Sequence, residues 1–511
     1  MKKLLLYVSA GLLLGSITSC QKYLDINQDP DRIVETKAPM DLLLTNVQVN
    51  IGFAGGSDLF RYPALFMQHF TGQGVGPITQ TQDYDKYLIQ SADVNNLWSG
   101  FNAVTLNDIE IIIRQATANN SPHFRGVAKL LKAYTYQHMV DAFGNVPFSE
   151  SQQTSANTSP KYDDGAAIYT SLLTMIDEGI ADINQTTSAA SPGTTSVIYA
   201  GTWATRRANW VKFGNTLKLR LLIHYSKLNP TLMVSSITAL VNSSGVSFMA
   251  ANADNFEMPF FNVTDRQNSI HQFEIRRPNH LFAGKFLVDA MNSKLDPRRP
   301  SYFVPFPANS GLYVGGVAGV PASQNFSRMH TYLRGAVTVA GTPIATGSQA
   351  GSYNALPTAG GIGYDGTAPS RMLTFAEYNF IRAEAALAGA PGSAQTFFQA
   401  GITASMQAAG VAAGDITTYL ATNGILTGSN ANMLSQIIAE KYIANYGVIQ
   451  ECWTDWRRTG YPAISMVPNA VTTAIPRILP YPQSEADANQ KFPGQRSDFH
   501  SVANRTFWDK P

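Results

Sequence analysis

Two glutamates at helical spacing are the first residues in this sequence that could do chemistry. Glu377 and Glu384 are seven positions apart, and a pair of carboxylates flanking a substrate is the arrangement that glycoside hydrolases use. Two helical turns separate them by about 10 Å along the axis, so they could act together only if that helix face lined a cleft. Because Arg371 and Arg382 lie close by in the sequence, we interpret both glutamates as structural ion-pair residues.

Other catalytic signatures are absent from the sequence. We find no His-Glu-x-x-His or His-x-x-x-His pair, no Gly-x-Ser-x-Gly elbow, and no Gly-Lys-Ser/Thr after the glycine-rich run 311–319. The acidic and basic residues Asp455, Arg457 and Arg458 are more typical of a capping and ion-pair cluster than of a phosphate site. We therefore predict no catalytic centre and no cofactor.

A calcium loop is suggested by Asp25, Asn27 and Asp29, which alternate near the N-terminus. The sixth position of an EF-hand loop should be glycine and is Pro30, while the twelfth should be glutamate and is Thr36. We reject this site and predict no metal ligands.

Binding of a sugar or a peptide needs different parts. Aromatic faces stack on the apolar faces of such a ligand, and amides, carboxylates or arginines take its polar groups. A loop aromatic more often packs onto its own lobe, so each candidate has a structural alternative. The predicted ligand-binding residues are Tyr84, Tyr87, Phe260, Phe261, Asp265, Arg266, Asn268, Tyr313, Phe326 and Arg328.

Amphipathic helices must position these loops. Residues 125–147 carry apolar side chains at helical spacing, with Pro122 before them and Gly144 after them as boundary signals. Residues 371–389 alternate alanines with large aromatics, which is the packing pattern of tetratricopeptide-type helix pairs. Further helices are predicted at 39–51, 59–70, 92–118, 165–184, 209–228, 232–242, 279–292, 394–408, 432–458 and 484–489.

Composition places the chain among globular proteins that bury a large core. It has 511 residues, of which 44% are apolar and 14% charged, with a formal net charge of +2. No basic stripe indicates nucleic-acid binding. We predict a mainly α fold with a few short strands: a tetratricopeptide-like helix-pair scaffold over about 37–245 and 367–511, and an irregular, loop-rich ligand lobe over about 246–366.

The N-terminus has the features of an export signal. Lys2 and Lys3 precede an apolar stretch at 4–17, which is too short to span a membrane as a helix. Small residues directly before Cys20 are typical of a bacterial lipoprotein signal peptide over 1–19, with Cys20 acylated and the single domain running over 20–511. The alternative is an ordinary signal-peptidase site near the same position. Cys452 would then lack an intramolecular partner, and we predict that it is a buried small hydrophobe.

Four segments together resemble the SusD/RagB family of Bacteroidota outer-membrane lipoproteins, most closely its second SusD-like branch. A helix running into Tyr-Gly-Asn-Val-Pro is matched by 133–147, with Phe143 at the tyrosine position. The family's Met-x-x-Ala-Glu-x-x-Phe-Ile-x-Ala-Glu-Ala helix is similar to 372–385, and its Glu-x-Trp-x-Asp-x-Arg-Arg helix to 451–458. The closing Pro-Arg, Pro, Glu and Asn pattern resembles 476–489.

The resemblance implies a predominantly α fold built on four tetratricopeptide-like helix pairs, with the ligand held by the irregular lobe. It also implies that a lipidated Cys20 anchors the protein in the outer membrane, at the cell surface. The implied partner is a SusC-like TonB-dependent transporter, over which the lipoprotein sits as a hinged lid.

The function that follows is non-catalytic capture in polysaccharide utilisation. We expect a nutrient-uptake protein that binds oligosaccharides, or other nutrient fragments, and delivers them to the transporter. The alternatives are a RagB-like lipoprotein that binds peptides, a secreted glycoside hydrolase, and a scaffold that presents only a protein-binding surface.

Overall fold

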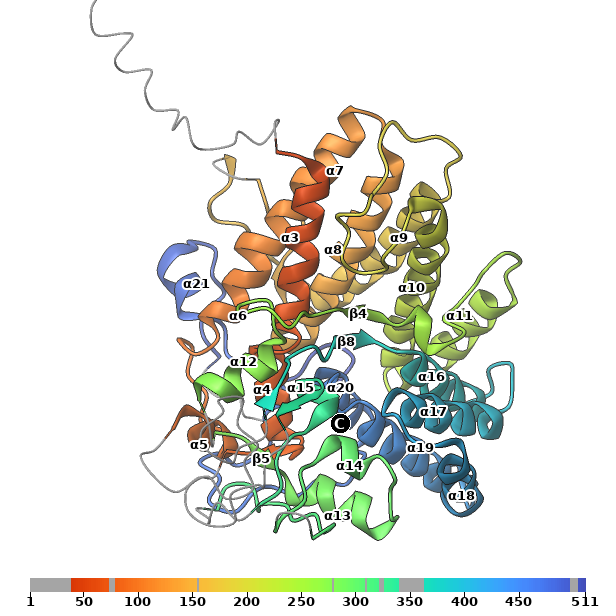
Figure 1. Ribbon diagram of the computed structural model, residues 1–511. Coiled ribbons are helices and arrows are strands. Elements are labelled where there is room, and N and C mark those ends of the chain that lie inside the picture. The colour runs from red at the N-terminus through yellow and green to blue at the C-terminus, as the bar shows by residue number, and fades with distance from the viewer. Residues whose placement is uncertain are drawn as a thin grey trace, which may run out of the picture.

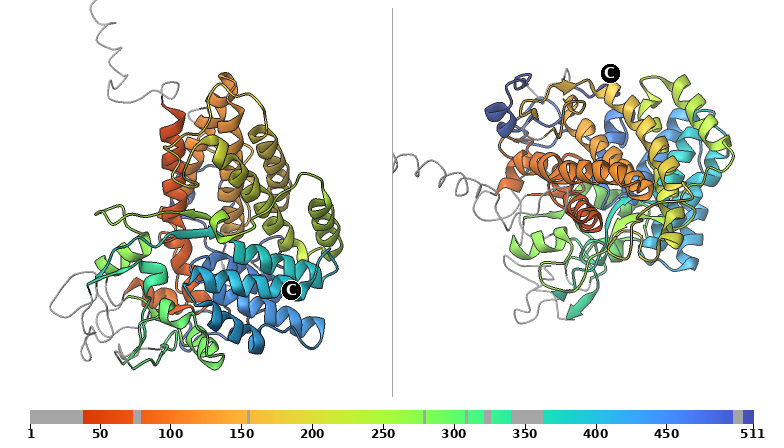
Figure 2. Two further views of the ribbon diagram at one scale, coloured as in Figure 1. Left: turned by 45° about the vertical axis from the view of Figure 1, so that its right-hand side comes forward. Right: turned by 90° about the horizontal axis from the view of Figure 1, so that it is seen from above.

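The computed structural model describes residues 38–72, 79–153, 156–277, 280–307, 310–320, 326–339, 363–496 and 504–511. The predicted signal peptide, the lipidation site at Cys20 and the rejected calcium loop lie outside these residues. Figures 1 and 2 show a largely helical molecule, with α7 to α10 in the upper half of Figure 1 and α16 to α19 at its lower right. The predicted mainly α fold with few short strands is therefore confirmed.

The first half of the scaffold places its longest helices side by side. Helix α8 packs mainly against α9 and α7, α9 packs against α10, and α3 lies along α7. These helices are α3 (Met40–Ala54), α7 (Asn107–Ala118), α8 (Pro122–Phe143), α9 (Gly165–Ile183), α10 (Trp203–Ile223) and α11 (Pro230–Asn242).

The second half repeats this pairing with shorter helices. Helix α16 packs against both α17 and α19, and also against α10 of the first half. The helices are α16 (Phe375–Leu387), α17 (Ala394–Ala408), α18 (Ala413–Asn423), α19 (Asn430–Ala444) and α20 (Ile449–Thr459). The contact between α10 and α16 joins the two halves.

Short elements form the rest of the described structure. The helical ones are α4 (Asp58–Phe66), α5 (Gln80–Asp85), α6 (Asn95–Ser99), η3 (Gly100–Leu106), η5 (His224–Ser226), η6 (Asn252–Asp254), α12 (Ser269–Arg276), α13 (Lys285–Ser293), α14 (Arg299–Tyr302), α15 (Thr331–Arg334) and α21 (Gln483–Ala488). The strands pair antiparallel in twos: β1 (Phe70–Thr71) with β5 (Phe282–Ala283), β2 (Val146–Pro147) with β3 (Tyr162–Asp163), β4 (Phe256–Met258) with β8 (Ser370–Leu373), and β6 (Val337–Val339) with β7 (Gly363–Tyr364). Each of these two-stranded sheets joins two connecting segments of the chain by backbone hydrogen bonds.

Several predicted helix boundaries are wrong for identifiable reasons. The helix predicted over 432–458 is two helices, because Gly447 between them has a φ of 130° that an α-helix does not accommodate. The helix predicted to begin at 279 begins at Lys285, since β5 is paired with β1 just before it. The range 371–389 likewise opens as strand β8, and the Thr374 side chain caps the helix that follows. The sequence analysis did not predict helices α5, α12, α14, α15 and α18.

Helix α8 is buried on nearly all of its faces, because other helices surround it. Pro122 opens it at the first turn, and Gly144, with a φ of 74°, ends it. Its closest approach is to α9, where a Cβ added to Gly126 would lie 2.5 Å from the carbonyl oxygen of Gly179. A Cβ added to Gly179 would in turn lie 3.0 Å from the carbonyl oxygen of Gly126. The two glycines therefore set the distance between these helices.

We expect Gly126→Ala to lower the free energy of unfolding by about 1–3 kcal/mol, because the methyl group meets backbone that can yield only if α8 and α9 separate. Gly414→Ala is the matched control. Gly414 lies in α18 with nothing within 4 Å of its added Cβ, so alanine there should be neutral or stabilising by up to about 1 kcal/mol. Urea unfolding followed by circular dichroism compares the two; equal midpoints would show that the glycine contact is not tight.

Candidate functional site

The glutamates singled out above belong to a buried ion-pair network. Arg220 of α10 donates to both carboxylate oxygens of Glu377, at 2.8 and 2.6 Å, and to the carbonyl oxygen of Met372 at 2.7 Å. The side chains of Arg220 and Glu377 are both fully buried. Glu377 therefore joins α16 to α10 instead of facing a cleft.

The second glutamate is paired in the same way. Arg458 of α20 contacts both carboxylate oxygens of Glu384, one of them at 2.6 Å, and Asp455 at 2.5 Å. Lys441 of α19 lies 2.9 Å from Asp455. The interpretation of Glu377, Glu384, Asp455 and Arg458 as structural ion-pair residues is confirmed. The partners of the two glutamates are Arg220 and Arg458, however, whereas Arg371 and Arg382 donate to other groups. Arg457 donates to the backbone carbonyl oxygens of Asp141 and Arg477.

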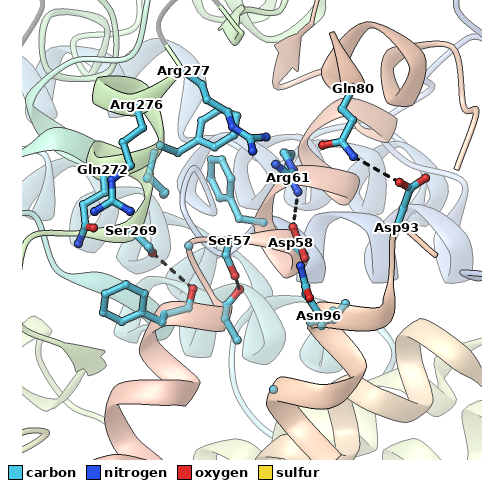
Figure 3. Close-up of a pocket in the computed structure, with 18 of the residues that line it drawn as sticks. Ser57, Asp58, Arg61, Gln80, Asp93, Asn96, Ser269, Gln272, Arg276 and Arg277 are labelled. Carbon is cyan, nitrogen blue, oxygen red and sulfur yellow. Dashed lines mark hydrogen bonds and ion pairs between the residues drawn. The ribbon is translucent and has the colours of Figure 1, made fainter. Parts of the chain in front are cut away.

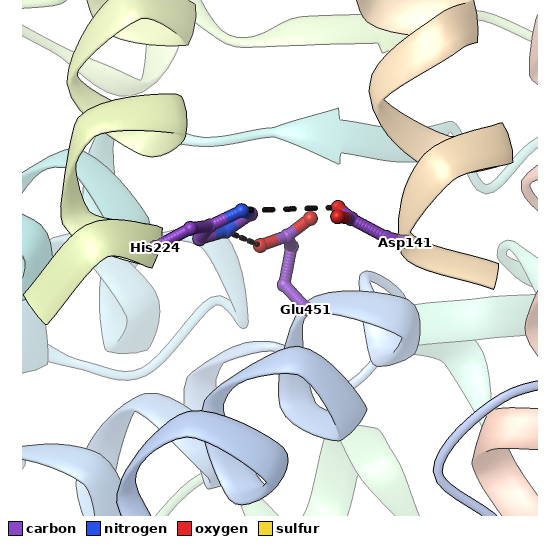
Figure 4. Close-up of side chains that lie close together, drawn as sticks. All are labelled: Asp141, His224 and Glu451. Atoms are coloured by element: carbon purple, nitrogen blue, oxygen red, sulfur yellow. Dashed lines mark hydrogen bonds and ion pairs between the residues drawn. The ribbon is translucent and has the colours of Figure 1, made fainter. Parts of the chain in front are cut away.

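A group of His, Asp and Glu at the centre of this network has the composition of a metal site. Asp141, His224 and Glu451 come from α8, from η5 at the end of α10, and from α20, and their potential ligand atoms lie within 4.8 Å of one another (Figure 4). All three are buried. Whether they could bind a metal ion depends on which of their lone pairs are not already used in hydrogen bonds.

Protein donors already occupy this group. Asp141 accepts hydrogen bonds from Tyr169, from Trp508 Nε1 at 2.9 Å and from Gln137 Nε2 at 3.0 Å. Glu451 accepts from Gln137 at 2.8 Å, and His224 Nε2 lies 3.3 Å from it. Burial raises the pKa of Glu451, but Arg220 and His224 outweigh burial and hold that pKa well below its usual range. We assign the group to the structural network.

A pocket lies on the other side of the molecule from α17 and α18, where α12 of the loop-rich lobe meets the end of α3 and the short helices α4, α5 and α6 (Figure 3). Its volume is about 860 Å³, which is in the range of small-ligand sites. The lining residues are Asn50, Phe53, Ala54, Gly56, Ser57, Asp58, Phe60, Arg61, Gln80, Tyr84, Ala92, Asp93, Asn96, Leu97, Gly100, Ser269, Ile270, Gln272, Phe273, Arg276, Arg277 and Leu281.

Polar groups sit on two sides of the pocket. On one side Arg61 donates to Asp58 three residues earlier, at the start of α4. On the same side Gln80 donates to Asp93 at 3.4 Å, and Asn96 lies beside Asp58, whereas Ser269, Gln272 and Arg276 lie on the opposite side (Figure 3). The pocket therefore offers amides, carboxylates and a guanidinium to hydroxyl-bearing ligands.

The aromatic wall of the pocket is Phe273 of α12. The Arg61 guanidinium carbon lies 5.3 Å from the centre of this ring, and that of Arg277 lies 5.9 Å from it. Tyr84 lines the pocket as well, although only 2% of it is exposed, and burial raises the pKa of its hydroxyl. Burial also raises the pKa of Asp58, despite the opposing charge of Arg61.

Of the predicted ligand residues, Tyr84 alone lines this pocket. Phe260 lies behind the lining residue Phe53, because its ring packs edge-on against that ring at 5.5 Å and is only 6% exposed. The turn that holds Phe261, Asp265 and Arg266 is exposed. It borders the pocket through Asp265, which lies 3.1 Å from Arg276.

The remaining predicted residues lie elsewhere, and most of them are buried. Tyr87 is fully buried, and its hydroxyl accepts a hydrogen bond from the backbone of Val467. Asn268 is 1% exposed and caps α12 through the N–H of Ile270. Arg328 is 1% exposed and stacks on Phe282, so these three present no surface to a ligand.

Two partly buried aromatics complete the predicted set. Tyr313 lies under Arg299, whose guanidinium carbon is 5.4 Å from its ring centre. Phe326 packs edge-on against Phe282 at 6.0 Å. Both therefore act as packing anchors within the lobe, and the structure does not bring the predicted residues together in one site.

Sequence reasoning missed most of the pocket. Asp58 and Arg61 lie at the i, i+3 spacing of an ion pair, but they fall in a range predicted as scaffold. Gln272, Arg276 and Arg277 lie in or just after α12, which was not predicted as a helix. The Arg276-Arg277 pair is visible in the sequence, but it does not mark the pocket, because the lobe contains a second adjacent pair at Arg298-Arg299.

The sequence matches one family model over residues 30–482, which is most of the chain. That family is the second SusD-like family, described as starch-binding and associating with the outer membrane. The chain belongs to the SusD-like family. No match is found among curated proteins.

Solved structures share the fold of this SusD-like protein. A chitin-binding protein superposes with a TM-score of 0.74 at 22% identity, covering 93% of this chain and all of its own. A SusD homologue from Bacteroides fragilis gives 0.71 at 20% identity, covering 92% of this chain and 100% of its own. A chitin-binding SusD homologue from Flavobacterium johnsoniae gives 0.68 at 20% identity, covering 92% and 97%.

The segments that carry the family resemblance lie in the buried network. Segment 372–385 contributes Glu377 and Glu384, and 451–458 contributes Glu451, Asp455 and Arg458. The pocket lies outside both segments. Among the described residues, no helix is long and apolar enough to cross a membrane.

We expect Glu377→Gln to lower the free energy of unfolding by about 3–5 kcal/mol, because it removes the carboxylate that the buried Arg220 guanidinium donates to and leaves only the more distant Glu451, at 3.8 Å, to balance its charge. Asp177→Asn is the control, since Asp177 pairs with Lys218 on the surface, where its side chain is 58% exposed and a pair contributes about 0–1 kcal/mol. Guanidinium unfolding midpoints measure both changes. An unshifted midpoint for Glu377→Gln would contradict a structural role for the pair.

Acid should destabilise the fold in part through two neutral histidines. Burial lowers the pKa of His69 and of His138 to about 3, whereas the unfolded chain titrates near 6.5. The unfolded state therefore binds more protons, and stability that is fully present above pH 6.5 is lost as pH falls toward 3, by up to about 1.4 kcal/mol per pH unit for each histidine.

His138→Leu should flatten this pH dependence between pH 6.5 and 4. Neither ring nitrogen of His138 has a hydrogen-bond partner among the described residues. The substitution therefore removes a titratable group without removing a side-chain hydrogen bond. Unfolding midpoints measured at half-unit pH steps give the slope for each protein. An unchanged slope would mean that His138 titrates in the fold as it does in the unfolded chain.

Proposed function

We propose that this SusD-like protein is an outer-membrane lipoprotein. It captures oligosaccharides in the pocket described above, which is lined by Asp58, Arg61 and Arg277 among others, and delivers them to a SusC-like TonB-dependent transporter. The observation that carries the proposal is the pocket itself, which combines an aromatic wall with amides, carboxylates and guanidinium groups around about 860 Å³. Sugars present apolar ring faces, which can stack on an aromatic side chain, and hydroxyl edges, which can hydrogen-bond to polar side chains.

The role proposed for the pocket is binding without chemistry. Of its two carboxylates, Asp58 is engaged by Arg61, and Asp93 accepts from Gln80 and from the backbone N–H of Gln90. A hydrolase needs one carboxyl group to donate a proton and a second to act as base or nucleophile. Carboxylates held by their neighbours in this way are suited to accept hydrogen bonds from hydroxyl groups.

The cellular part of the proposal rests on the family and on the N-terminal sequence. The family is described as associating with the outer membrane, and the predicted signal over 1–19 would leave Cys20 to be acylated. A lipid anchor at Cys20 places the pocket next to a transporter in the same membrane, where a captured oligosaccharide has a short path to the barrel.

We expect Asn96→Ala to weaken oligosaccharide binding by about 3- to 10-fold, because an amide that hydrogen-bonds a ligand contributes about 1 kcal/mol. The Asn96 side chain is exposed in the pocket and makes no hydrogen bond with the described residues, so the fold should not change. Gln407→Ala, on the exposed face of α17 and outside the pocket, is the control. Calorimetric titration with tri- to hexasaccharides from chitin, starch and pectin gives the affinities.

Chromatography of the same mixtures after prolonged incubation tests the absence of catalysis. The proposal expects binding by the wild-type protein, unchanged oligosaccharides, weaker binding by Asn96→Ala and normal binding by Gln407→Ala. Release of shorter sugars over time would overturn the binding role in favour of a hydrolase. Failure of every oligosaccharide to bind, in a correctly folded sample, would overturn the assignment of the pocket to sugars.

A further inference from the structure

The charges around Phe273 are unevenly matched. Arg61 and Arg277 both approach this ring, at 5.3 and 5.9 Å from its centre, and Figure 3 shows them directed toward the same part of the pocket. One carboxylate, that of Asp58, faces both of them. Asp93 is a second carboxylate nearby, because its charge also acts on Asp58, but neither carboxylate forms an ion pair with Arg277.

Asp58 is committed to Arg61. The two side chains are in direct contact and largely buried, with exposed fractions of 14% and 15%. The Arg277 guanidinium, by contrast, donates no hydrogen bond and forms no ion pair with any residue that the structure describes. The guanidinium carbon of Arg277 lies over the ring of Phe273, 5.9 Å from its centre.

The other charged groups nearby contact partners other than Arg277. Arg276 already has its own partner in Asp265, at the exposed rim. Asp93 also carries a negative charge, which acts on Asp58, but its oxygens accept hydrogen bonds from Gln80 and from the backbone N–H of Gln90, and it forms no ion pair with the described residues. Burial lowers the pKa of His280, and the charges of Arg277 and Arg61 lower it further.

We infer that the pocket selects acidic oligosaccharides, with the carboxylate of a uronic acid bound by the Arg277 guanidinium. The inference rests on the proposed function, because it names the class of sugar that the same pocket takes. A guanidinium presents two parallel N–H groups that match the two oxygens of a carboxylate. The Phe273 ring lies beside the group, 5.9 Å from the guanidinium carbon, within the range of a cation–π contact.

Neutral sugars would use the pocket less well. Their hydroxyl groups can accept hydrogen bonds from Arg277, but these bonds carry no opposite charge, and a charge-assisted bond is roughly twice as strong as a neutral one. Because the site is open to water, the advantage of the acid is moderate and declines as salt screens it.

The test compares trigalacturonate with its fully methyl-esterified counterpart, which has the same shape without the charge. Calorimetric titration at low ionic strength should show the acid bound about 5- to 10-fold more tightly than the ester, in line with one charge-assisted pair. Arg277→Gln should make the two affinities similar, because it weakens the binding of the acid and leaves the binding of the ester unchanged. Arg277 lies on the surface at the end of α12, so this variant should fold.

Arg276→Gln is the matched control, because it removes a neighbouring guanidinium that already has a carboxylate partner. This variant should retain most of the preference for the acid. The wild-type protein should show the same preference at pH 6 and at pH 8. Raising sodium chloride from 20 to 500 mM should shrink the preference in the wild-type protein and leave Arg277→Gln unaffected.

The outcomes separate this inference from the proposed function. Equal binding of acid and ester by the wild-type protein would overturn the inference and leave the proposed function standing. A preference that Arg277→Gln preserves would also overturn it. Binding of the acidic peptide triglutamate, without binding of any oligosaccharide, would overturn both.

Discussion

The ion pair between Arg220 and Glu377 is the contact on which the two halves of the scaffold depend. Both side chains are fully buried, so each charge needs a counter-charge close by, and each is the hydrogen-bonded partner of the other. Glu451 lies 3.8 Å from the same arginine, which adds α20 to the contact between α10 and α16. The aromatic and aliphatic core packs around this polar centre, and the relative placement of these helices follows from it.

The network explains why the matched family segments say nothing about a ligand. Segments 372–385 and 451–458 supply charges that face inward, where removing one partner would leave its counterpart stranded. The pocket uses other residues, at the junction of the first short helices with α12. A chain can therefore keep the scaffold and alter the pocket, because the two sets of side chains do not overlap.

Sequence patterns predicted the long helices well and the connections poorly. Residues 165–184 were predicted as a helix and α9 spans Gly165–Ile183, since a strong apolar period is a local property. The predicted 432–458 helix is interrupted at Gly447 by a backbone angle that the spacing of apolar residues does not encode. The loop aromatics were harder to place, because an aromatic side chain looks the same in sequence whether it packs inward, as Tyr87 does, or is exposed, as Phe261 is.

The sequence by itself determined the helical content, the near-neutral charge, the absence of catalytic motifs and the segments that identify the family. All of these depend on residue types and on spacings of a few positions. Only the tertiary structure decided that Glu377 pairs with an arginine 157 positions away, and that Arg61 and Arg277 meet on one phenylalanine ring. The physical reason is that ion pairing and stacking depend on distance in space, which packing of the whole chain sets and which separation along the chain does not reveal.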